Sequence, residues 1–185
     1  EKAGIAKAGA PLVTQYYTPA MARTIADVAS SRGTRSFPRQ QAWDIGLSRG
    51  LIDYRDINGS LSLPLPSMPG QHQAENAGLA VAMIRHQNRL KISSEAMEKG
   101  IASARWPARM QLLSDGPVVR VAPDLSEIWL DGGHNPDAAT IIARHFAQDM
   151  DRLGKVDFVM GMLASKDAQR YLEIIAPVTG SLIAV

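Results

Sequence analysis

Apolar and polar positions follow two different periods along this chain, and the change of period separates its parts. Over residues 42–65 apolar residues alternate with polar ones, and Asn58-Gly59 stands between two alternating segments. An Asn-Gly pair in such a place is the strongest short-range sign of a β-hairpin. We therefore predict two or three antiparallel strands here, after which Leu63-Pro64-Leu65-Pro66 leaves the sheet in an extended form.

Helical spacing of apolar residues flanks this region on both sides. Thr18-Pro19 places an N-cap before a proline at the first helical position, and Ser93-Ser94 caps a later helix that has Glu95 in its first turn. Trp106-Pro107 ends that helix. The pattern predicts a strand at 11–17 and helices at 19–30, 70–87 and 95–104.

Strands and helices alternate in the last third of the chain. We predict strands at 118–121 and 127–130, forming an extended hairpin around Pro123-Asp124, and then a helix–strand–helix–strand series. This β-α-β-α-β order is typical of a parallel sheet. The change of pattern near 109–111 predicts a boundary between a domain of residues 1–108 and one of residues 109–185. The series comprises a helix at 136–153, a strand at 156–162, a helix at 166–176 and a strand at 181–185.

Composition narrows the classes of function. The chain has 185 residues, a net charge of +2 and no cysteine, which excludes disulfides, thiolate zinc sites and a cysteine nucleophile. Neither a phosphate loop of the G-x-x-x-x-G-K-[ST] type nor a G-x-S-x-G elbow is present. Near-balanced charge gives no case for nucleic acid, and no apolar run is long enough to cross a bilayer. We therefore expect a cytoplasmic protein that binds neither nucleic acid nor a membrane.

The segment Leu130–Pro136, LDGGHNP, concentrates the candidate chemistry. A short apolar strand runs into an acid, two glycines and a histidine, and Asn135-Pro136 opens a helix. Such a strand–turn–helix can place a phosphate at the helix N-terminus, with Asp131 on a ribose hydroxyl and His134 near the phosphate. The same residues also make an ordinary turn with a helix cap, so this stretch alone leaves both interpretations open.

Five motifs in order resolve this ambiguity by resemblance. They are EKAGIAKAG from Glu1, HQAENA from His72, WPARM from Trp106, LDGGHNP from Leu130 and GMLASKD from Gly161. Together they resemble folylpolyglutamate synthase/dihydrofolate synthase, a family of the Mur ligase superfamily, as an internal segment without the upstream phosphate loop and the C-terminal end. The implied fold is α/β: the end of a Mur-ligase-type ATPase domain with an antiparallel hairpin region, followed by the start of a Rossmann-like parallel β-α-β domain.

The resemblance assigns roles to five residues. Lys2 would be carbamylated and help to hold Mg²⁺, a hard ion that accepts oxygen ligands. Asn76 would lie against the nucleotide, and Arg109 would reach ATP from the hinge between the two domains. Asp131 would bind the ribose, and His134 would lie near the phosphates and share the catalytic role with Lys2.

The resemblance also implies an activity. ATP would convert a carboxylate to an acyl phosphate, and the amine of L-glutamate would attack it, with dihydropteroate or a tetrahydrofolate polyglutamate as acceptor. The sequence leaves open which acceptor is used. Ala108 and Gly133 replace a glycine and an alanine of the family pattern, both small-for-small changes. We expect the protein to be a monomer. We also expect residues 1–185 by themselves to have no ligase activity. The alternatives are another Mur-type ligase, or a non-catalytic nucleotide-binding module.

Overall fold

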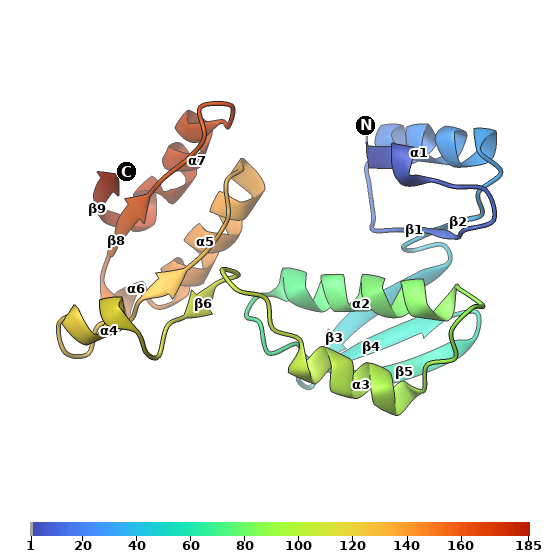
Figure 1. Ribbon diagram of the computed structural model, residues 1–185, viewed down its shortest axis with the longest axis horizontal. Coiled ribbons are helices and arrows are strands. Elements are labelled where there is room, and N and C mark those ends of the chain that lie inside the picture. The colour runs from blue at the N-terminus through green and yellow to red at the C-terminus, as the bar shows by residue number, and fades with distance from the viewer. Residues whose placement is uncertain (1) are drawn as a thin grey trace. The chain divides into compact units, whose positions relative to one another are not determined.

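The chain folds into two compact units, the first ending at Arg105 and the second running from Trp106 to Val185. The computed structural model describes residues 2–185, and of Lys2 and Leu153 only the backbone. Figure 1 shows the two units, each with its own helices and sheet. Each has its own buried core. The assignment of residues 1–108 and 109–185 to an ATPase and a ligase domain stays a prediction.

An antiparallel sheet lies at the centre of the first unit. Its strands β3 (Trp43–Ser48), β4 (Leu51–Asp56) and β5 (Gly59–Pro64) follow in chain order, which confirms the predicted antiparallel strands. Asp56 pairs with Gly59 across the second hairpin, so the turn itself holds Ile57 and Asn58. Gly59 has a φ of 103°, a backbone conformation that favours glycine and explains the Asn-Gly signal.

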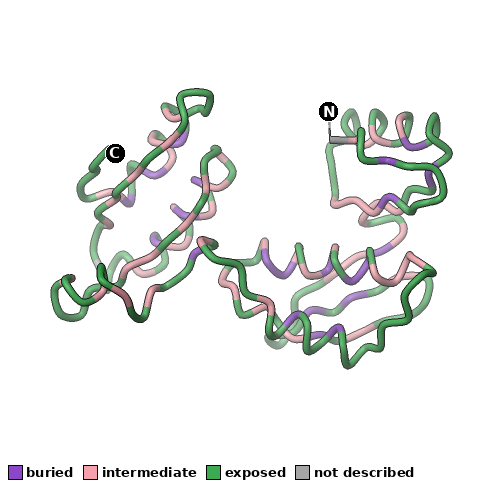
Figure 2. Tube along the Cα trace, in the orientation of Figure 1, coloured by how far each residue is buried: buried purple, intermediate pink, exposed green. Residues whose placement is uncertain are grey.

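Helices α2 (Gln71–Arg85) and α3 (Ser94–Ser103) pack with this sheet around one buried cluster (Figures 1 and 2). Gly78 allows the close approach of α2, because a Cβ there would stand 2.6 Å from Cγ2 of Ile45 on β3. Both helices were predicted. The buried members of the cluster are Trp43, Ile52, Tyr54, Leu63, Ala74, Val81, Ala82, Met97 and Ile101.

The start of the chain forms a smaller layer. A 3₁₀ turn, η1 (Lys2–Ile5), precedes strand β1 (Leu12–Thr14), which pairs in parallel with β2 (Ser36–Pro38). Helix α1 (Pro19–Ser31) joins the two strands, with its predicted proline at the first position. The predicted strand at 11–17 is shorter than expected, and β2 was not predicted.

The second unit contains one parallel β-α-β unit of the predicted series, but the predicted strand at 127–130 belongs to a separate antiparallel pair and not to the parallel sheet. Strands β8 (Val156–Met160) and β9 (Thr179–Ala184) are parallel and are joined by α7 (Ala168–Ile175) and the 3₁₀ turn η2 (Ala176–Val178). The helix predicted at 136–153 is divided into α5 (Pro136–Gln148) and α6 (Met150–Leu153). Buried residues of α5, α7 and η2 form the core with Met110; they are Ala139, Ile142, Phe146, Tyr171, Ile175 and Val178.

The strand predicted at 118–121 is wrong. Residues 118–121 are not a strand but part of a short helix, α4 (Pro117–Val121), which begins with a proline at its first position after Gly116. Val118 and Val121 are exposed there, so their β-branched side chains were a misleading sign. In place of the predicted hairpin, β7 (Trp129–Leu130) pairs antiparallel with β6 (Gln111–Leu112). Among residues 2–185, no helix is long and apolar enough to cross a membrane.

Candidate functional site

The turn after β7 (residues 131–133) is hydrogen-bonded to the linker before β6 (residues 108–110). We call this set of backbone contacts the clamp. Asp131 accepts two backbone hydrogen bonds, from Met110 N to Oδ2 at 2.8 Å and from Gly133 N to Oδ1 at 2.6 Å. The Gly132 amide donates to the Ala108 carbonyl at 2.9 Å. The bond between Asp131 and Gly133 is an Asx-turn, which the Asp-Gly-Gly pattern foreshadowed. The bond to Met110 has no counterpart in local sequence, because it joins residues 21 positions apart.

The linker backbone is bent on both sides of Arg109. Ala108 and Met110 have φ values of 56° and 43°, in the left-handed region that side chains with a Cβ rarely adopt. The Gln111 side chain accepts a hydrogen bond from the Ala108 amide at 3.0 Å. Met110 is buried in the core of the second unit, whereas Arg109 is exposed. The linker is therefore anchored through Met110, and Arg109 extends from the bend.

Gly133 is more than a small-for-small replacement. A Cβ at this position would stand 2.6 Å from Oδ1 of Asp131, 2.7 Å from Cβ of Ala138 and 3.3 Å from Cδ1 of Ile142. In this chain the turn therefore packs so closely against the first residues of α5 that a side chain at position 133 would require a shift of its neighbours. The neighbouring Gly132 is different, because a Cβ there would meet nothing closer than 3.5 Å.

The helix that follows the turn starts with its predicted cap. Oδ1 of Asn135 accepts a hydrogen bond from the Ala138 amide at 2.9 Å, which satisfies one of the unpaired amides of the first turn. His134 is exposed, and its Nδ1 lies 3.0 Å from the Gly132 carbonyl. The pKa of Tyr171, a buried phenol on α7, is raised by burial and by the negative charge of Asp131. Tyr171 is therefore a neutral neighbour of the carboxylate.

Asn76 and Lys2 belong to the first unit. Asn76 lies on the exposed side of α2, where its Nδ2 donates to Gln73 Oε1 at 3.3 Å. It borders a cleft of about 390 Å³. The side chain of Lys2 lies outside the described residues, so its role stays a prediction. The other residues lining the cleft are Gln15, Tyr16, Arg39, Gln40, His72 and Glu75.

The structure brings together Arg109, Asp131 and His134 in the second unit, with their backbones linked by the clamp. Their roles in binding a nucleotide stay predictions. Among residues 2–185 no group of three histidine, aspartate or glutamate residues could hold a metal ion.

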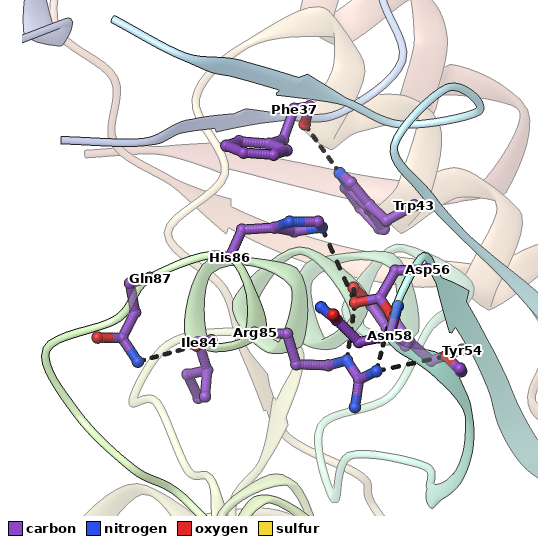
Figure 3. Close-up of polar contacts among 10 residues, drawn as sticks. Phe37, Trp43, Tyr54, Asp56, Asn58, Ile84, Arg85, His86 and Gln87 are labelled. Atoms are coloured by element: carbon purple, nitrogen blue, oxygen red, sulfur yellow. Dashed lines mark hydrogen bonds and ion pairs between the residues drawn. The ribbon is translucent and has the colours of Figure 1, made fainter. Parts of the chain in front are cut away.

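A second polar cluster, in the first unit, was not anticipated from the sequence (Figure 3). Asp56, whose side chain is completely buried, accepts hydrogen bonds from Tyr54 Oη at 2.9 Å and from Arg85 Nε and Nη2, each at 2.7 Å. His86 stacks on Phe37 with ring centroids 4.3 Å apart. Its Nε2 is buried without a hydrogen-bond partner, 3.8 Å from Oδ2 of Asp56.

Burial and charge shift the titration of this cluster. Burial lowers the pKa of His86, and the charges of Arg85 and Arg35 lower it further, against the opposing charge of Asp56. Burial opposes ionisation of Asp56, but hydrogen bonds from Arg85, Tyr54 and the Asn58 amide outweigh it and hold its pKa below the usual value. Burial and the bond to Asp56 raise the pKa of Tyr54. Near neutral pH the cluster thus contains one ion pair and a neutral imidazole.

No family model matches the chain. It is 34% identical over 168 residues to the dihydrofolate synthase/folylpolyglutamate synthase of Escherichia coli K12, which covers 90% of the chain and 36% of that protein. The structure matches E. coli FolC in complex with DHPP and ADP with a TM-score of 0.78 and 32% sequence identity. The match covers 98% of the present chain and 40% of the FolC chain.

A bifunctional folylpolyglutamate synthase/dihydrofolate synthase with Mn, AMPPNP and L-glutamate bound matches with a TM-score of 0.76, at 29% identity over 98% of the chain and 40% of that chain. The chain thus spans well under half the length of these relatives. The similarity confirms the predicted α/β class, with its antiparallel and parallel sheets. Over nearly its whole length, the chain is related to a segment of the folylpolyglutamate synthase/dihydrofolate synthase family.

Proposed function

We propose that this chain is part of an ATP-dependent ligase that joins L-glutamate to dihydropteroate, to folate glutamyl tails, or to both, through an acyl phosphate. One observation carries the proposal: the fold matches FolC in complex with DHPP and ADP with a TM-score of 0.78 over 98% of the chain. That structure's ligands, and the AMPPNP, Mn and L-glutamate of a second match, support ATP and a divalent metal such as Mg²⁺ as requirements. We also propose a cytoplasmic location.

The exposed groups of the second unit suit the nucleotide part of this reaction. Arg109 carries a planar guanidinium that can bind phosphate oxygens through two parallel hydrogen bonds. His134 stands immediately before the capped N-terminus of α5, where negative charge is favoured. Phosphoryl transfer needs positioning and charge neutralisation more than covalent help from the protein. Arg109 and His134 would supply these, while Asn76 of the first unit would lie against the nucleotide.

The decisive experiment measures glutamate-dependent release of ADP by the purified full-length protein, with dihydropteroate and tetrahydrofolate supplied in parallel. Turnover with the first acceptor indicates dihydrofolate synthesis, and turnover with the second indicates polyglutamate extension. Turnover that requires a different amino acid would instead indicate another Mur-type ligase. ATP binding without any turnover would indicate a non-catalytic nucleotide-binding module, and both of these results contradict the proposal.

Arg109→Ala provides the matched residue test. A hydrogen bond to a charged group contributes about 1.5–3 kcal/mol, so we expect the KM for ATP to rise about tenfold or more. Arg120→Ala removes another exposed arginine of the same unit, one that pairs with Asp115 at 3.3 Å, and should leave the KM unchanged. Residues 1–185 alone should release no ADP in response to glutamate.

A further inference from the structure

We propose that Asp131 is a positioning residue for Arg109: its carboxylate holds the linker on the turn, so that the guanidinium is presented from a fixed backbone. This inference rests on the proposed function, in which Arg109 binds ATP. It differs from the role that the family resemblance implies for Asp131, which is a direct hydrogen bond to the ribose.

Both oxygens of Asp131 are already used within the protein. Oδ2 accepts from Met110 N at 2.8 Å and Oδ1 from Gly133 N at 2.6 Å. Each oxygen of a carboxylate can accept more than one hydrogen bond, so a ribose hydroxyl is not excluded. The orientation of the carboxylate, however, is set by the two amides, which belong to the two segments that the clamp joins.

The clamp restrains the chain on both sides of Arg109. Before it, the Ala108 carbonyl accepts from the Gly132 amide at 2.9 Å; after it, the Met110 amide donates to Asp131. Ala108 and Met110 both have positive φ values, and such conformations persist only where surrounding contacts impose them. Without the carboxylate, the buried Met110 amide loses its acceptor and the bend loses the contact that holds it.

Gly133 completes the arrangement. Any side chain there would strike Oδ1 of Asp131 at 2.6 Å and Cβ of Ala138 at 2.7 Å. The carboxylate or the first turn of α5 would then have to shift, and a shift of the carboxylate would weaken its hold on Met110. Glycine at position 133 therefore keeps Asp131 in the orientation that restrains the linker.

The test is a double-mutant cycle on the full-length protein, with binding of AMPPNP measured by calorimetry for wild type, Arg109→Ala, Asp131→Ala and the double variant. Residues that act as a unit give non-additive losses, with couplings of about 2- to 150-fold. We expect Asp131→Ala to weaken binding about tenfold or more in the wild-type background and less than twofold in Arg109→Ala. Asp137→Asn, which removes an acid from the first turn of α5 without touching the linker, should change affinity less than twofold.

A second comparison uses ATP and 2′,3′-dideoxy-ATP, which lacks both ribose hydroxyls. If Asp131 acts through Arg109, Asp131→Ala weakens binding of both nucleotides by the same factor. A loss confined to ATP, or an undiminished loss in the Arg109→Ala background, overturns this inference alone. Failure of the wild-type protein to bind either nucleotide overturns the proposed function and this inference with it.

Amide hydrogen exchange, measured without nucleotide, distinguishes a local release of the linker from misfolding of the variant. In Asp131→Ala we expect faster exchange at Met110 and Gly133 while the amides of β8 and β9 keep their wild-type protection. The milder variant Asp131→Asn keeps one acceptor oxygen, so its affinity should fall between those of the wild type and Asp131→Ala. Unchanged exchange at Met110 in Asp131→Ala would show that the carboxylate does not hold the linker, and would overturn the proposal.

Discussion

Arg85 binds Asp56 through two parallel hydrogen bonds, with Nε and Nη2 each 2.7 Å from a different carboxylate oxygen. The aspartate side chain is completely buried and the arginine side chain is 15% exposed, so the pair joins the end of β4 to the end of α2 inside the first unit. Removing one partner of such a pair leaves an uncompensated buried charge, which costs far more than the pair contributes.

Arg85→Ala should therefore lower the free energy of unfolding by about 3–5 kcal/mol. Lys99→Ala is the matched control, because Lys99 pairs with Glu95 on the exposed face of α3, with both side chains more than 70% exposed, and should cost less than about 0.5 kcal/mol. Urea denaturation of both variants measures the difference. Equal losses for the two substitutions would contradict the assignment of Asp56 as a buried, arginine-dependent charge.

Acid should weaken the first unit through His86. Burial holds its pKa below the usual 6.5, so between that value and the folded-state pKa the unfolded chain binds more protons. Stability is then present above pH 6.5 and is lost as the pH falls through this window. His86→Gln should flatten the fall in unfolding midpoint between about pH 7.5 and pH 5; a slope equal to that of the wild type would refute the assignment.

Asp56 acts in a different pH range. Its pKa is lowered in the folded state, so its contribution is fully present above the unfolded value of about 3.9 and is lost only as the pH falls below that value. Asp56→Asn should therefore be destabilising near neutral pH, and the difference from wild type should shrink below about pH 4. Denaturation midpoints measured from pH 7 to pH 3 check this, and a constant difference would contradict it.

Ala108→Gly should stabilise the second unit. Alanine in the left-handed region at φ 56° costs about 1–2 kcal/mol, whereas the added freedom of glycine in the unfolded chain costs about 0.5–1 kcal/mol. A net gain of about 0.5 kcal/mol follows. Ala147→Gly, on the exposed face of α5, should lose up to about 1 kcal/mol instead. A loss at both positions would refute the strained linker.

Gly133→Ala should destabilise the protein by about 1–3 kcal/mol, because the new methyl group would overlap Asp131 and Ala138. Gly132→Ala adds the same methyl group one residue earlier, where the nearest atom is 3.5 Å away, and should change stability much less. Thermal unfolding of the two variants compares neighbouring glycines directly. Similar midpoints would show that the turn adjusts freely around position 133.

Local signals predicted much of this structure. The proline at the start of α1, the Ser93 and Asn135 caps and the hairpin before Gly59 each depend on neighbouring residues, which the sequence displays directly. The prediction at 118–121 was wrong because Val118 and Val121 are exposed on α4 and pair with no strand, so their β propensity was not decisive. A proline after Gly116 was the better sign.

Contacts between residues far apart in the sequence could not be predicted from local patterns. The residues around Asp56 do not indicate that it will accept hydrogen bonds from Arg85, 29 residues later. The residues around Met110 likewise do not indicate its hydrogen bond to Asp131. The family motifs named Arg109 and Asp131 as neighbours in function, but not the backbone bonds that connect their segments. Motif resemblance therefore pointed to Arg109 and Asp131 as candidate residues, whose roles stay predictions, and the structure shows how their backbone segments are held together.

The paired strands β6 and β7 lie at the two ends of one long loop. Leu113 N donates to the Ile128 carbonyl at 2.8 Å, so the intervening segment, including α4, leaves the ladder and returns to it at one point. The entropy of closing such a loop grows only slowly with its length, by about 0.6 kcal/mol for each doubling. Insertions or deletions between these two residues should thus be tolerated without disturbing Arg109, leaving this segment free to vary in length among relatives.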